Sequence, residues 1–154
     1  MITVRVEGID RVQRTLGRNI TPVLQSVTMA VATEIHGKIA PYPPASAANM
    51  PGGPGSQWYE RGYGPRWMTM RGQIRGRRTS QTLGRRWSVS GWGRIGAVVR
   101  NIASYSPFVH SHEQRAWFHK RRGWVSDEEA VDKVLRSGAI DRIVDAVIMR
   151  HYGA

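Results

Sequence analysis

The sequence predicts an α+β protein, in which a small antiparallel sheet is packed by a long N-terminal helix and followed by a Pro/Gly-rich arm and two C-terminal helices. Three patterns predict this class. Polar and apolar residues alternate at the amino terminus, apolar residues recur at spacings of three and four after Thr21, and two β-branched segments flank a glycine-rich turn. Because 154 residues is the size of one ordinary domain, we expect residues 1–154 to form a single domain with an extended arm at about 41–80.

The amino terminus is expected to form a strand. Ile2, Val4 and Val6 alternate with polar residues, which indicates a strand with one buried face that ends at Gly8. Apolar spacing over 9–16 predicts one or two helical turns after it.

The long helix is predicted to begin at Thr21-Pro22. Threonine supplies a capping oxygen, and proline fits the first helical position, where its missing N–H is no loss. The helix ends before Pro41, and its apolar stripe comprises Leu24, Val27, Val31, Ile35 and Ile39.

Residues 41–80 differ in composition from the rest of the chain. They contain six of the eight prolines and seven of the seventeen glycines, which favours a long loop or arm without a regular element. Aromatic residues and arginines are interleaved there, so we expect the arm to dock on another surface instead of acting as a plain flexible linker.

A hairpin and a loop are predicted next. Leu83–Val89 and Ala97–Ile102 are rich in β-branched and aromatic residues and read as its two strands, joined by the turn SGWGRIG. The segment SYSPFVHSHEQ follows as a loop whose regularity is broken by Pro107.

Two helices end the predicted fold. Ser126 and Glu129 form a capping box, so a helix is expected from there to Gly138, with an apolar face of Val131, Val134 and Leu135. The last helix is expected over 140–149 and should bury Ile140, Ile143, Val144, Val147 and Ile148.

The charge is concentrated in the middle of the chain. The formal net charge is +12, and residues 61–122 hold fourteen of the 23 Lys and Arg residues but only one acidic residue, Glu113. Such a balance favours contact with a polyanion and makes copies of the chain repel one another.

Several classes of protein are disfavoured by composition. The chain has no run of eighteen apolar residues and no signal-peptide pattern, so we expect synthesis in a cytoplasm-like compartment and no membrane partner. Zero cysteines exclude disulfides, thiol nucleophiles and Cys-ligated zinc.

The histidines form the only candidate metal cluster. His110 and His112 would share one face of a strand, with His119 and Glu113 as further ligands. The spacing matches no recognisable metal motif, and histidines in a loop are usually solvated or bonded to the backbone. We therefore expect no metal site.

A small nuclease is the enzymatic alternative. His119 followed by Lys120, Arg121 and Arg122 could stabilise a phosphate transition state. A solvated basic turn before a helix explains the same residues more simply, and no glycine-rich phosphate loop is present. We expect no catalytic residue and no cofactor.

The central arginines have two interpretations, which are compatible with each other. They could neutralise DNA phosphates without reading sequence, or form protein contacts, since Arg, Trp and Tyr are enriched at interface hot spots. The residues expected to face a DNA channel or a partner are Arg61, Arg66, Arg71, Arg75, Arg77, Arg78, Arg85 and Arg86.

Five segments in order give the chain a family resemblance. They are YPPAS (42–46), WYERGYGPRW (58–67), RTSQTLGRRWSV (78–89), ASYSPFVH (103–110) and EQRAWFHKRRGW (113–124). Together the chain resembles a family of neck or tail-completion proteins of long-tailed bacteriophages and prophages. The likeness spans most of the chain, and it depends on the order of the motifs more than on any one of them.

The resemblance implies a non-catalytic virion protein, made in the host cytoplasm, that completes the tail top and joins it to the DNA-filled head. It implies a ring, a hexamer in the family pattern, around a channel that carries double-stranded DNA, with the tail terminator and head-tail connector as neighbours. The arm would clasp an adjacent subunit through Tyr42, Pro43, Pro44, Trp58, Tyr59, Tyr63 and Trp67. The alternative is a basic nucleic-acid-binding protein that acts alone.

Overall fold

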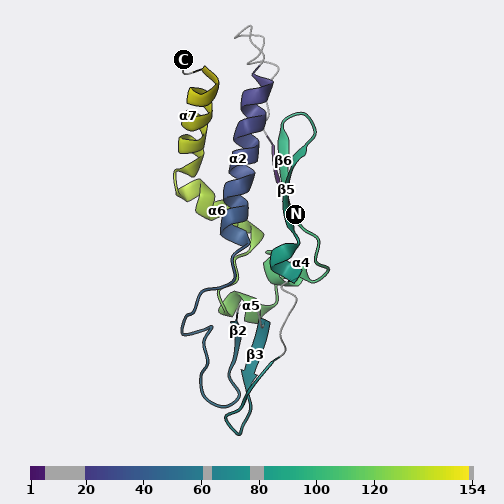
Figure 1. Cartoon of the computed structure of the whole chain (residues 1–154), viewed down its shortest axis with the longest axis vertical. Coiled ribbons are helices and arrows are strands. Elements are labelled where there is room, and N and C mark those ends of the chain that lie inside the picture. The colour runs from purple at the N-terminus through teal and green to yellow at the C-terminus, as the bar shows by residue number, and fades with distance from the viewer. Residues whose placement is uncertain (6–19, 61–63, 77–81, 153–154) are drawn as a thin grey trace. The chain divides into compact units, whose positions relative to one another are not determined.

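The computed structural model describes residues 1–5, 20–60, 64–76 and 82–152 (Figure 1). The chain divides into two compact units. The first comprises Met1–Lys38, Trp87–Asn101 and Glu129–Ala154, and the second comprises Ile39–Arg86 and Ile102–Glu128. The expectation of a single domain stays a prediction, because this division does not say whether either unit folds alone. The residues expected to end the first strand and to form helical turns over 9–16 lie outside the described part of the chain.

The first unit contains a three-stranded antiparallel sheet with the order β1-β6-β5. Its strands are β1 (Ile2–Val4), β5 (Trp87–Trp92) and β6 (Gly96–Asn101), and the register pairs Val99 with both Ile2 and Val89. The central strand β6 buries Ala97, Val98 and Val99, since it has a neighbour on each side and a helix over the sheet. The predicted α+β class and small antiparallel sheet are therefore confirmed.

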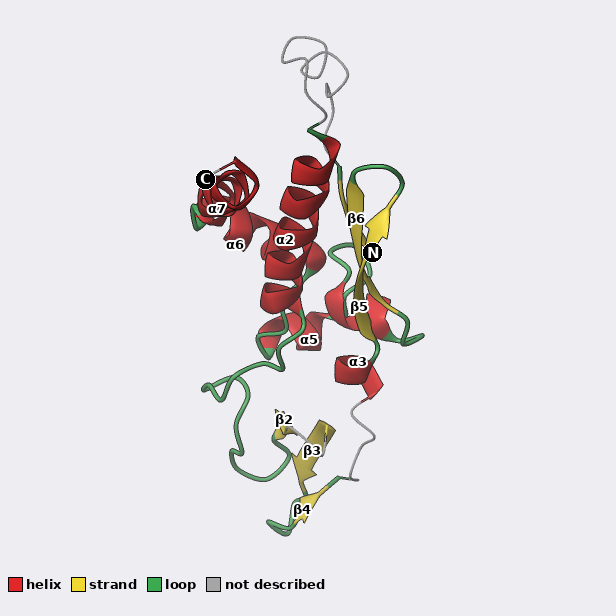
Figure 2. Ribbon diagram, turned by 45° about the horizontal axis from the view of Figure 1, so that its top comes forward, coloured by secondary structure: helices red, strands yellow, loops and turns green. Residues whose placement is uncertain are grey.

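The helix over this sheet is α2 (Thr21–Ile39), whose predicted start and end are confirmed (Figure 2). Of the predicted stripe, Val31, Ile35 and Ile39 are buried, whereas Leu24 and Val27 are half-buried. Ala32, outside that stripe, is buried as well. Two polar contacts tie its amino-terminal half to the β5–β6 turn. The Gln25 side chain donates to the Arg94 carbonyl at 2.7 Å, and the Arg94 guanidinium donates to the Thr21 hydroxyl at 3.3 Å.

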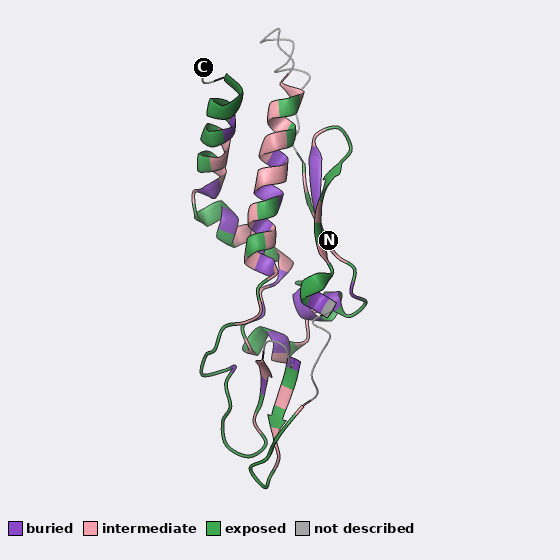
Figure 3. Ribbon diagram, in the orientation of Figure 1, coloured by how far each residue is buried: buried purple, intermediate pink, exposed green. Residues whose placement is uncertain are grey.

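The two C-terminal helices are α6 (Asp127–Arg136) and α7 (Ala139–Tyr152), joined at Gly138, whose φ of 64° suits a helix end. Helix α7 runs beside α2, and His151 lies 3.2 Å from the Ser26 hydroxyl (Figure 1). The predicted buried faces are partly wrong. Leu135 is 59% exposed and Ile148 is 43% exposed, because the buried faces of the two helices are centred on Val134 and Val147 instead. Much of the ribbon of these helices is coloured as exposed (Figure 3).

The second unit contains a small sheet within the segment that was expected to lack regular structure. Its strands are β2 (Gln57–Glu60), β3 (Gly64–Met68) and β4 (Ile74–Arg75), paired antiparallel in that order. The loop interpretation is wrong for these residues. Most prolines precede β2, and Pro65 lies at the start of β3 opposite Tyr59 of β2, a position where a strand tolerates proline.

Three short helices complete the second unit: α3 (Thr82–Arg85), α4 (Ser106–His110) and α5 (Trp117–Arg121). The predicted strand start at Leu83 is wrong, because residues 82–85 form a helical turn and β5 begins at Trp87. The predicted loop around Pro107 is also wrong in part. Proline lies in the first turn of α4, where it favours a helix.

We found no helix in the described ranges with enough length and apolar character to span a bilayer.

Gly96 provides a test of the first sheet. A Cβ atom there would lie 2.7 Å from the Trp92 carbonyl oxygen and 3.3 Å from that of Val4, both in neighbouring strands. Gly96→Ala should therefore lower the free energy of unfolding by about 1–3 kcal/mol, as overpacking does. Gly91→Ala is the matched control, because a Cβ at Gly91 meets nothing within 4 Å. Equal midpoints for the two variants in urea denaturation would contradict this packing.

Candidate functional site

Trp124 is the centre of the second unit's core. It is 3% exposed and packs with Leu83, Ala103 and Val109. The residue before it, Gly123, has a φ of 85°, which side chains other than glycine rarely adopt. This turn reverses the chain after α5, so that the Trp124 N–H donates to the His119 carbonyl at 3.2 Å.

Four further rings surround Trp124, and we call the five together the aromatic cluster. The ring centroids of Tyr42, Tyr59, His110 and His119 lie 5.1, 5.4, 5.4 and 6.2 Å from that of Trp124. Three of the four pairs are edge-on, a geometry that the quadrupoles of aromatic rings favour. The cluster therefore joins the segment before the small sheet, the sheet itself, α4 and α5.

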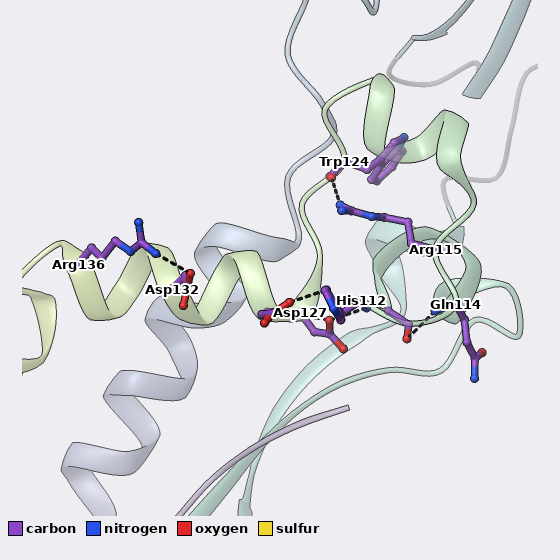
Figure 4. Close-up of polar contacts among 9 residues, drawn as sticks. His112, Gln114, Arg115, Trp124, Asp127, Asp132 and Arg136 are labelled. Carbon is purple, nitrogen blue, oxygen red and sulfur yellow. Dashed lines mark hydrogen bonds and ion pairs between the residues drawn. The ribbon is translucent and has the colours of Figure 1, made fainter.

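Backbone carbonyls near Trp124 are held by basic side chains. The Arg115 guanidinium donates to the Trp124 carbonyl at 2.8 Å (Figure 4), and the His110 Nδ1 donates to the Val125 carbonyl at 2.7 Å. On the same loop the His112 N–H donates to the Asp127 carboxylate at 2.7 Å. These contacts fix the path of the chain from α4 past α5 to the start of α6.

Asn49 ties the proline-rich segment to β2. Its side chain is 3% exposed, its oxygen accepts from the Tyr59 N–H at 2.7 Å, and its nitrogen donates to the Pro44 carbonyl at 3.3 Å. A buried amide with partners on both atoms stabilises a loop, since leaving either atom unpaired costs about 1–3 kcal/mol. Residues 44–49 are thereby held against the small sheet.

His119 is a buried neutral imidazole. Burial, reinforced by the positive charge of Arg122, lowers the pKa of His119 to about 4. The Tyr59 hydroxyl lies 3.2 Å from His119 Nδ1, and because the ring is neutral the hydroxyl can donate to it. Burial raises the pKa of Tyr59, so the phenol keeps the proton that this hydrogen bond needs.

Arg122 covers the same pair from the outside. Its guanidinium lies 5.3 Å from the Tyr59 ring centroid and 5.5 Å from that of Phe118, within cation–π range. It also donates to the Gln57 side chain at 3.0 Å. Arg122 therefore links α5 to β2.

An open groove adjoins the cluster within the second unit, and we call it the cationic groove. It is lined by parts of 47–59 and 117–122 and by Pro65. None of the described residues that line it is acidic, whereas two, Arg121 and Arg122, are basic. Its apolar wall includes Met50 and Trp117, which are 51% and 72% exposed. The groove combines positive charge with apolar surface.

The predicted channel arginines have different environments. Arg66 is half-buried and pairs with Glu60 at 3.5 Å, so it is less available to a phosphate. Exposed positions are occupied by Arg71, Arg75, Arg85 and Arg86. Arg61, Arg77 and Arg78 lie outside the described residues. The proposed contact of these arginines with DNA or a partner stays a prediction.

The aromatic residues predicted to clasp a neighbouring subunit are partly engaged within the chain. Tyr42 and Tyr59 belong to the aromatic cluster, and Trp58 is 4% exposed. Trp67 keeps 45% of its surface exposed, and Pro44 is exposed next to the half-buried Pro43. Tyr63 lies outside the described residues. The clasp stays a prediction. Among the clasp residues that the structure describes, Trp67 is the most exposed aromatic residue.

The expected histidine geometry is wrong. His110 and His112 do not share a strand face, because His110 ends α4 and is buried, while His112 is exposed and pairs with Glu128 at 2.5 Å. Within the described ranges no three His, Asp, Glu or Cys side chains are grouped so that they could hold a metal ion. His119 lies in the aromatic cluster, and Lys120 and Arg121 beside it are exposed.

No family model matches the chain, and neither a curated protein nor a solved structure matches it.

Sequence reasoning did not identify Asn49 or the pairing of Tyr59 with His119. No local pattern indicates either, because the partners are 10 and 60 residues apart. The aromatic content of WYERGYGPRW and RAWFHKRRGW was visible, and only the fold brings these segments together.

The two buried histidines should make the second unit sensitive to acid. Burial lowers the pKa of both His110 and His119, so the unfolded state binds more protons as the pH falls below about 6.5. The contribution of the two neutral histidines to the free energy of unfolding is therefore fully present above pH 6.5. It declines toward pH 4, by at most about 1.4 kcal/mol per pH unit for each proton. Thermal melts monitored by tryptophan fluorescence from pH 7.5 to 4.5 measure it.

His119→Gln isolates the histidine contribution from that of carboxylates, which also protonate in this range. The variant should lose less stability than the wild type between pH 6.5 and 4.5. Parallel profiles for the two proteins would contradict a neutral buried His119.

Proposed function

We propose that the chain is a structural subunit of the neck or tail top of a long-tailed bacteriophage or prophage. In this role it completes the tail and joins it to the DNA-filled head, as one member of a ring around the DNA channel. The tail terminator and the head-tail connector are its proposed neighbours. We propose no catalytic role and no cofactor.

One observation carries the proposal: both units leave large apolar side chains exposed. They include Trp117 and Phe108 in the second unit, 72% and 57% exposed, and Leu135 and Met149 in the first, 59% and 67% exposed. Large exposed apolar side chains suit a protein whose surface is covered by other proteins. A subunit that is surrounded by neighbours in an assembly would cover it.

The charge supports the second half of the proposal. A ring of chains with a net charge of +12 each would repel itself, and DNA in the channel would offset that repulsion. The exposed arginines Arg71, Arg75, Arg85 and Arg86 are suited to phosphates, since they read no sequence and tolerate any DNA that passes. The resemblance of the ordered motifs to neck proteins supports the same role.

A protein that binds nucleic acid alone would use the same arginines. It would have no need for the exposed apolar side chains of α6 and α7, which lie on helices with few basic residues. The assembly role therefore accounts for more of the surface.

Disruption of the gene in the phage or prophage that carries it tests the proposal. We expect DNA-filled heads and finished-looking tails that remain separate in negative-stain images, because the joint between them is incomplete. Wild-type protein supplied in trans should restore joined particles. Normal virions from the disrupted phage would end the proposal.

The same complementation tests the arginines. Arg85→Gln/Arg86→Gln should restore fewer infectious particles than the wild type, because two contacts to DNA or to a neighbouring ring are lost. Lys133→Gln/Arg136→Gln is the matched control, since it removes the same charge from exposed positions of α6. Equal yields from the two pairs would contradict a role for the central arginines.

A further inference from the structure

The outward face of α7 carries an unusual set of exposed side chains. Asp141, Asp145, Ile148 and Tyr152 recur at spacings of three and four, and Met149 lies four residues after Asp145, so the five share one side of the helix. The opposite side faces α2 and buries Val147, which is 4% exposed. Ile148, Met149 and Tyr152 are 43%, 67% and 48% exposed. We call this side the α7 face.

The α7 face has two parts that need different partners. Its amino-terminal part has two exposed aspartates and Arg142, whose guanidinium donates to the Ser137 carbonyl at 3.0 Å, and its carboxyl-terminal part is apolar. A partner surface must therefore be both cationic and apolar. A partner that was only charged would leave three large apolar side chains in water.

The cationic groove of the second unit has this complementary chemistry. Its described lining contains no acidic residue, Arg121 is exposed within it, and Met50 and Trp117 give it an exposed apolar wall. Trp and Arg are also the residue types most enriched at the centres of protein interfaces. Charge and apolar surface thus match on both sides.

We propose that the α7 face of one copy of the chain docks in the cationic groove of the next copy. The two surfaces are different parts of the chain, so the contact is heterologous, and repetition of it generates a ring or an open filament. This inference deepens the proposed function and rests on it, because it names the surfaces through which the neck ring would form.

A second copy fits the groove better than nucleic acid does. A nucleic acid strand could stack on Trp117 and bind Arg121, but it would repel the two aspartates of the α7 face and leave that face uncovered. Docking of α7 covers both surfaces in one contact.

Asp145 and Arg121 are the residues to change. Asp141 lies in the first turn of α7, where the helix dipole favours an acidic side chain, so its replacement would also weaken the helix. Asp145→Arg and Arg121→Asp should each weaken self-association by about tenfold or more, because each places like charges opposite one another in the contact. Sedimentation velocity over a range of concentrations measures it.

Two controls carry the same changes in charge at exposed positions outside both surfaces. They are Glu113→Arg for the first variant and Lys133→Asp for the second. The dissociation constants for self-association of both controls should lie within about twofold of each other and of the wild-type value, apart from the general effect of net charge. Circular dichroism checks that every variant is folded.

Mixing the two variant proteins is the decisive experiment. The Asp145→Arg and Arg121→Asp proteins should associate when combined in equal amounts, since the exchanged charges attract between unlike copies. A chain carrying both substitutions should associate by itself. A contact within one chain could not give recovery on mixing.

Three results would overturn the interface. They are a wild type that is monomeric at every concentration, single variants that associate as well as their controls, and a mixture that does not recover. A fourth result would also overturn the interface. The wild type would bind a fluorescent oligo-dT strand, and Arg121→Asp would abolish this binding while leaving self-association unchanged. The groove would then be assigned to nucleic acid. Each of these results leaves the gene-disruption outcome unaffected, so failure of this interface is distinguishable from failure of the proposed neck role.

Discussion

The packing of rings around Trp124 is the interaction on which the second unit depends. The unit has a short sheet and three short helices, none of which buries much apolar surface by itself. Trp124 provides a shared partner for segments up to 77 residues apart, from Tyr42 before the sheet to His119 in α5. Because the two histidines of the cluster are neutral and buried, the same packing that stabilises the unit makes it sensitive to protonation.

Both cores are small and leave large apolar side chains exposed to solvent. In the first unit, small and β-branched residues fill the space between α2 and the sheet, while Leu135, Ile148 and Met149 on the C-terminal helices remain exposed. An isolated protein gains nothing from such residues and risks aggregation. In a subunit that is surrounded by neighbours, these side chains add interface area. The concentrated positive charge opposes association until a polyanion or an acidic surface offsets that charge.

The sequence predicted those elements whose signals are local. The Thr21-Pro22 start of α2 and the Ser126 start of α6 each depend on a few neighbouring residues and are confirmed. The α2 stripe is confirmed in part, at Val31, Ile35 and Ile39. The small sheet was missed because its prolines and glycines lie in connections and at a strand start, where they break no pairing. The candidate site was visible only as composition. Its geometry depends on contacts such as Tyr59 with His119, which no local pattern encodes.

We propose that the chain is part of the joint between head and tail. Reconstruction of that joint by electron cryomicroscopy, from purified particles of the phage that encodes the chain, tests it most directly. The account predicts a ring of repeated densities around the DNA channel, into which both units fit, with exposed arginines of the second unit directed toward DNA or an adjacent ring. Absence of the chain from purified particles, or its location away from the joint, would contradict it.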